Sequence, residues 1–276
     1  MRITETGSTR VMRQVRRLSV LAAMPALLIT VRPAASQSTP GASTSAPSER
    51  AQQSRGRGFL FGAPTVTLSL RGGYNIARAG GDVFDHTREF LTVNRSDFGA
   101  LTVAADLGVR VASQLDVLFS FAHAGTSVRS EFRDWVDQDD LPIEQKTRFS
   151  QTPLTVGMRY YLVPRGRQIG RFVWIPTKVV PYIGATIGGV YYNFEQTGDW
   201  VDFQDLAIFT DRLDSSGWTG MGQLLGGVDV AMSPWLSLVA EGRFSIANGS
   251  PGPDFVGFDG IDLAGLQFTA GLSFRM

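Results

Sequence analysis

Few residues in this 276-residue chain are suited to catalysis. The sequence has two histidines, His86 and His123, and no cysteine, so disulfides and thiolate metal sites are excluded. Ser127 follows His123 by four residues, but a serine nucleophile also needs an acid that orients the histidine. No such acid can be identified, and no segment has the spacing of a calcium-binding loop. The sequence therefore predicts no catalytic residue, no metal site and no cofactor.

Charged residues recur at alternate positions inside apolar segments. In Leu101–Val111 (LTVAADLGVRV) one face is apolar, and Asp106 and Arg110 lie on the other. Because an unpaired buried charge costs several kcal/mol, charges on the inner face of a closed sheet must pair. We therefore predict an interior ion-pair network with four bases and four acids. Its members are Arg71, Asp106, Arg110, Asp116, Arg159, Asp229, Glu241 and Arg243.

These charges belong to a series of segments with a period of two. Each segment is about as long as a tilted membrane-spanning strand, which needs about 9–11 residues. Short connections alternate with long ones, as in outer-membrane barrels, except that the long connection 163–180 falls where a short turn is expected. The predicted strands are 66–74, 101–111, 115–123, 154–162, 181–194, 220–232, 236–244 and 263–276, and the predicted long loops are 75–98, 124–148, 195–217 and 245–262.

A soluble β-sandwich with charges facing water is the alternative to a barrel. Its polar faces would be rich in lysine, whereas the chain has only Lys146 and Lys178, both outside the predicted strands. Aromatic residues also gather near the predicted strand ends, as at membrane–water interfaces. The sequence therefore predicts an all-β fold, an eight-stranded antiparallel transmembrane up-and-down β-barrel.

The N-terminal residues have the features of a secretory signal peptide. Arg10, Arg13, Arg16 and Arg17 precede the apolar run Leu18–Val31, and Ala34-Ala35-Ser36 follows as a small-residue cleavage site. A start at Met12 would give a more usual length. We assign residues 1–36 to the signal peptide.

The remainder divides into two parts. Residues 37–58 are rich in Ser, Thr, Pro and Gly, which predicts a disordered linker, and residues 59–276 form the barrel domain. Of the net charge of +1, residues 1–36 carry +5, which leaves about −4 for the rest. A nucleic-acid partner is therefore not expected.

The last eight residues, TAGLSFRM, resemble the C-terminal signal of bacterial outer-membrane proteins. The matching residues are Thr269, Gly271, Phe274 and Met276, although that signal usually ends in Phe or Trp. Over residues 60–276 the chain resembles the small barrels of the OmpA, OmpX and OmpW kind. The resemblance implies a Gram-negative-type cell outer membrane. It also implies contact with outer-membrane lipids and lipopolysaccharide, and recognition by the barrel-assembly machinery.

A charged interior in an eight-stranded barrel leaves little space for a pore. We therefore expect a non-enzymatic protein with a role in envelope integrity or surface interaction, through long acidic loops. The alternative is a porin-like protein, an OmpW-like narrow channel or carrier for small hydrophobic solutes. That alternative needs an apolar inner pocket near the loops, and Leu118, Leu225 and Val239 are the only bulky apolar residues on the predicted inner face.

The connection 163–180 combines basic residues with aromatic ones. It includes Arg165, Arg167, Arg171 and Lys178. Such a segment either contacts anionic headgroups on the periplasmic side or forms a plain packed turn.

Overall fold

The structure is a computed structural model that describes residues 60–170, 173–202 and 207–276. The predicted signal peptide (1–36) and linker (37–58) lie outside the described residues. None of the described helices is long and apolar enough to cross a membrane.

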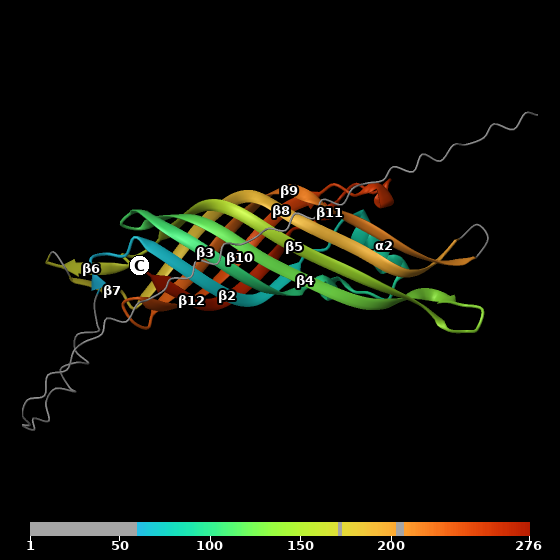
Figure 1. Cartoon of the computed structure of the whole chain (residues 1–276), viewed down its shortest axis with the longest axis horizontal. Helices are drawn as coiled ribbons and strands as arrows, with labels where there is room; N and C mark the ends of the chain where they lie inside the picture. The colour runs from blue at the N-terminus through green and yellow to red at the C-terminus, as the bar shows by residue number, and fades with distance from the viewer. Residues whose placement is uncertain (1–59, 171–172, 203–206) are drawn as a thin grey trace, which may run out of the picture. The chain divides into compact units, whose positions relative to one another are not determined.

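Eight antiparallel strands close into a ring, in which each strand pairs with two neighbours (Figure 1). The last strand of the ring pairs with the first, with Ala270 opposite Gly72, which leaves no free edge. This closure confirms the predicted fold class. The strands are β2 (Val66–Ala77), β3 (Ala100–Ala112), β4 (Leu115–Val136), β5 (Pro142–Tyr161), β8 (Val179–Val201), β9 (Ile208–Ala231), β10 (Leu236–Gly249) and β12 (Gly265–Arg275).

Two predicted loops, 124–148 and 195–217, are wrong, because most of their residues belong to strands. The β4–β5 ladder continues to Glu131 opposite Glu144, and the β8–β9 ladder continues to Val201 opposite Ile208. At about 3.4 Å per residue, the 24 residues of β9 extend over roughly 80 Å, far beyond an apolar band about 25 Å tall. Beyond that band the outward residues become polar, so the apolar alternation stops while the hydrogen-bonded ladder continues.

The first and last long connections also contain short elements that the sequence did not reveal. The first holds helix α2 (Asp82–Phe90) and the 3-10 turn η2 (Arg95–Phe98), and the last holds η3 (Pro253–Phe255) and β11 (Ile261–Asp262). Helix α2 buries Val83, Phe84 and Thr87 on one face. Its other side stays exposed, so the helix lies against the end of the barrel with one face.

A second, three-stranded sheet forms at the opposite end of the barrel from α2 (Figure 1). It has the order β1–β7–β6 and consists of β1 (Leu60–Phe61), β6 (Gly166–Ile169) and β7 (Val173–Pro176). The long connection between β5 and β8 is therefore a folded hairpin. Because the short turns lie at this end, we refer to it as the periplasmic end, and to the other as the extracellular end.

The outward face of the barrel is apolar. Large side chains such as Leu101 of β3, Ile187 of β8 and Leu224 of β9 expose more than 60% of their surface. Monomers in water rarely expose apolar patches beyond a few hundred Å². Since the closed ring also satisfies its backbone groups internally, this exterior is suited to contact with lipid.

Candidate functional site in the barrel interior

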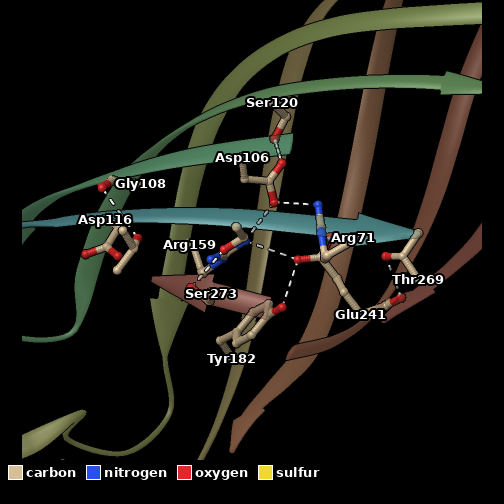
Figure 2. A network of polar contacts seen from close by, with 12 residues as sticks. Arg71, Asp106, Gly108, Asp116, Ser120, Arg159, Tyr182, Glu241, Thr269 and Ser273 are labelled. Atoms are coloured by element: carbon tan, nitrogen blue, oxygen red, sulfur yellow. Dashed lines mark hydrogen bonds and ion pairs between the residues drawn. The ribbon is translucent and has the colours of Figure 1, made fainter. Parts of the chain in front are cut away.

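Five charged residues meet in the middle of the lumen: Arg71, Asp106, Arg159 and Glu241, which Figure 2 labels, and Arg243. Asp106 of β3 accepts hydrogen bonds from Arg71 at 2.5 Å, Arg159 at 3.1 Å and Arg243 at 2.8 Å. Ser120 donates to its other oxygen at 2.7 Å. One carboxylate is therefore shared by guanidinium groups from β2, β5 and β10.

Glu241 of β10 is held by the same three arginines. It accepts a hydrogen bond from Arg71, one from Arg159 at 3.2 Å and one from Arg243 at 2.5 Å. Tyr182 adds a fourth donor at 2.9 Å. All five charged residues expose 4% or less of their surface. The network (Arg71, Asp106, Arg159, Glu241 and Arg243) thus occupies the lumen with side chains from four strands.

The structure places the other three predicted network residues elsewhere. Asp116 is buried nearer the periplasmic end, where it accepts hydrogen bonds from Arg165 at 2.8 Å and Tyr161 at 3.2 Å. Asp229 is buried and makes no ion pair among the described residues. Arg110 lies at the β3–β4 turn, where its Nε donates to the Ala112 carbonyl at 3.2 Å.

The hairpin between β5 and β8 turns two side chains into the periplasmic end of the barrel. Arg165 is buried over the Tyr161 ring, with its guanidinium carbon 4.6 Å from the ring centroid, and Trp174 exposes only 2% of its surface. The basic–aromatic connection therefore does not present these two residues to headgroups. Arg167 and Lys178 are exposed, and Arg171 lies outside the described residues.

Sequence reasoning missed two buried arginines, Arg165 and Arg275. Arg275 lies on the inward face of β12, with its guanidinium 5.9 Å from the Trp174 ring centroid. The period of two places Arg275 on the same inward face of the strand as Thr269. No comparable signal marked Arg165, because it belongs to a connection and not to a predicted strand.

An aromatic cluster fills the extracellular end of the barrel. Phe84 of α2 packs edge to face on Phe98, Phe149 and Phe194, with ring centroids 4.9, 5.3 and 5.4 Å apart. Phe255 of η3 adds a ring 5.6 Å from Phe194. All five rings are buried. The first and last long connections thus close the mouth of the barrel with their own side chains.

The layers between these two ends are also filled. Below the aromatic cluster, a polar void of about 10 Å³ lies among residues that include Gln151, Gln223 and Gln267, which is space for about one water molecule. Below the network, Leu118, Leu225 and Val239 pack with Val180 and two tyrosines. Side chains therefore occupy the lumen at the aromatic cluster, at the network and in the apolar layer below it.

His123 lies on the lipid-facing side of β4, and its hydrogen-bond partner is on the next strand. Its Nδ1 is 2.8 Å from the Thr152 hydroxyl. Among the described residues it makes no ion pair with a carboxylate. No group of three His, Asp or Glu side chains suited to a metal ion occurs in the described part of the chain.

Three of the C-terminal residues that resemble an assembly signal lie on β12, and Met276 follows its last residue. Thr269 points inward, and its hydroxyl is 3.5 Å from the Glu241 carbonyl. A Cβ atom added at Gly271 would overlap the Leu70 carbonyl oxygen of β2. Phe274 stacks on Trp235, with ring centroids 6.2 Å apart, and Met276 is exposed.

The closed ring, the apolar exterior and the charged interior together define the class of the protein. It is a small outer-membrane β-barrel protein, in which polar residues fill the lumen and apolar residues face lipid. No protein-family model matches the chain, and no curated protein matches it.

Several solved structures are similar in outline. One is Ail, the attachment invasion locus protein of Yersinia pestis, in complex with the heparin analogue sucrose octasulfate. It is 12% identical in sequence, the match covers 77% of this chain and 99% of Ail, and the TM-score is 0.40. Neisserial surface protein A is 11% identical, with coverage of 76% and 96% and a TM-score of 0.42. OprG from Pseudomonas aeruginosa is 14% identical, with coverage of 78% and 98% and a TM-score of 0.40. At these values the assignment depends on the geometry of the chain itself.

Proposed function

We propose that this protein is a sealed, non-enzymatic outer-membrane barrel that acts in envelope integrity or in surface interaction through its extracellular hairpins. The observation that carries the proposal is the five-residue network in the middle of the lumen. Its three guanidinium groups and two carboxylates are buried and mutually bonded. Opening a water-filled path through the barrel would require these pairs to separate.

The alternative of an OmpW-like channel or carrier is not favoured by a specific observation. Such a protein needs an apolar pocket at the loop end of the lumen. The space at that end is instead filled by the aromatic cluster, in which Phe84 and Phe194 are fully buried. A solute would have to displace α2 before it entered.

The proposed role depends on two kinds of partner. The lipid-facing exterior would hold the barrel among outer-membrane lipids, with lipopolysaccharide in the outer leaflet. The C-terminal residues Thr269, Gly271, Phe274 and Met276 would be recognised by the barrel-assembly machinery during insertion.

A complementation experiment tests this proposal and separates its two roles. A strain that lacks the gene would receive either the wild type or a variant in which the extracellular parts of both hairpins, 127–146 and 195–214, are replaced by short turns. If the barrel supports envelope integrity, the shortened variant restores resistance to detergent. If the hairpins mediate surface interaction, only the wild type restores adhesion. Faster osmotic swelling of vesicles that contain the folded protein, in a solution of a small sugar, would contradict the sealed barrel.

A further inference from the structure

The extracellular parts of β4, β5, β8 and β9 pair into one continuous sheet, and the charge of its outward residues changes with distance from the membrane. The row nearest the membrane consists of His123, Thr152, Tyr191 and Trp218, which lie side by side on adjacent strands. The Tyr191 and Trp218 rings lie 5.7 Å apart, and Trp218 is 64% exposed. Exposed Tyr and Trp are typical of the level where lipid meets water.

Four residues further along the strands, the outward row consists of Ser127, Arg148, Glu195 and Asp214. Glu195 is almost fully buried between two arginines, with 2.9 Å to Arg148 and 2.8 Å to Arg212, while these arginines expose 52% and 63% of their side chains. Glu195 thus fixes both guanidinium groups and leaves much of each open to solvent.

The next outward row is basic. Arg129 lies directly opposite Lys146, followed by Thr197 and Arg212 on the next two strands. Neither Arg129 nor Lys146 makes an ion pair among the described residues. Like charges directly opposite each other destabilise a sheet. Such a pair is therefore retained at a cost to stability, which is offset when an anion binds between the two side chains.

One row further from the membrane, the residues paired on β4 and β5 are both acidic, with Glu131 opposite Glu144. The two rows nearer the membrane together hold four cations and two carboxylates. They lie roughly 10–15 Å above the aromatic row once the strand tilt is included, and long basic side chains can reach down towards the headgroups from there. The two rows nearer the membrane thus carry a net charge of +2 together, and the Glu131–Glu144 pair beyond them is acidic.

We propose that the basic face formed by Arg129, Lys146, Arg148 and Arg212 binds the phosphorylated headgroups of lipids in the outer leaflet. Arg148 and Arg212 would supply oriented guanidinium groups to phosphate oxygens, and Arg129 with Lys146 would hold a second phosphate between them. This inference rests on the proposed membrane function, since it names the lipid partner of the same barrel.

Native mass spectrometry tests this inference by measuring the Kd of added dipalmitoyl phosphatidic acid. The folded protein is released from tetraethylene glycol monooctyl ether micelles for this measurement. Each cation near an anionic surface contributes about 1 kcal/mol, so each charge removed weakens binding about five-fold. We expect the first phosphatidic acid to bind more tightly than phosphatidylcholine. Arg129→Gln with Lys146→Gln should then weaken its Kd roughly 25-fold.

The matched control is Arg78→Gln with Arg95→Gln, which removes two exposed cations from the first long connection. It should bind phosphatidic acid like the wild type, and all three proteins should show heat-modifiable gel migration. Wild-type affinity in the Arg129/Lys146 variant would overturn the inference, as would equal affinity of the wild type for the two lipids. Binding of a soluble sulphated polysaccharide without lipid preference would also overturn it. A conducting barrel would contradict the proposed function and leave these Kd values unchanged.

Discussion

Asp106 of β3 and Arg243 of β10 are joined inside the barrel at 2.8 Å, although two strands, β2 and β12, lie between them in the ring. Those two strands form the seam where the first and last strands of the barrel pair. Arg71 and Glu241 bond across the same seam. The network therefore holds the closure of the barrel from the inside, in addition to filling its lumen.

Asp106→Asn should lower the free energy of unfolding by about 3–5 kcal/mol, because it removes the charge that three buried guanidinium groups share. The measurement is a urea titration of the protein in lipid vesicles, followed by gel migration. Asp139→Asn is the control, since Asp139 is exposed at the tip of the β4–β5 hairpin, and it should change stability by less than about 0.5 kcal/mol. A similar small change for Asp106→Asn would contradict the clamping role of the network.

Two arginines of the periplasmic hairpin should behave differently. Arg165→Gln leaves the buried Asp116 carboxylate without its ion pair, so we expect a loss of roughly 3–5 kcal/mol in the same titration. Arg167, two residues away, is exposed, and Arg167→Gln should stay within about 0.5 kcal/mol of the wild type. Equal effects of the two variants would show that the hairpin does not insert Arg165 into the barrel.

The aromatic cluster should hold α2 against the extracellular end of the barrel. Phe84→Ala removes a ring in contact with three others, a change that typically costs about 3–5 kcal/mol. Because α2 belongs to a connection and not to the strand ring, we expect this loss to appear as protease cleavage within 78–99 while the barrel still shows heat-modifiable migration. Glu89→Ala, on the exposed side of α2, should remain uncleaved, and cleavage of both variants at one rate would contradict this packing.

Gly271 belongs to the segment that resembles an assembly signal, yet the structure gives it a separate packing role. Gly271→Ala would force its Cβ against the β2 backbone, so we expect a loss of about 1–3 kcal/mol and slower refolding in detergent without any assembly machinery. Gly220→Ala is the control, because a Cβ there meets nothing within 4 Å. Normal refolding of Gly271→Ala in detergent, with a defect only in cells, would assign the glycine to recognition alone.

The period of two predicted the ring and its inward charges because both faces of a membrane strand have constant surroundings. It failed in the extracellular parts of β4 and β9, where water meets the outer face and Arg129 or Arg212 replaces an apolar residue. It also could not predict contacts between parts distant in sequence. The pairing of Arg165 with Asp116 depends on how a connection folds back into the barrel, which alternation along one strand does not encode.

Helix α2 illustrates the same limit. Its nine residues carry a short apolar face that gains stability from rings on η2, β5, β8 and the last connection. Isolated helices of this length are marginal in water, so local sequence alone did not distinguish it from a loop.

The most direct test of the sealed barrel is the conductance of the refolded protein in a planar lipid bilayer, with heat-modifiable gel migration as proof that it has folded. The network, the aromatic cluster and the inserted hairpin predict a silent bilayer at 100 mV applied potential, on the order of that across a cell membrane. Discrete ion-conducting steps from the folded wild type would contradict the account, because a continuous water path cannot pass the Asp106–Arg243 pair as it stands.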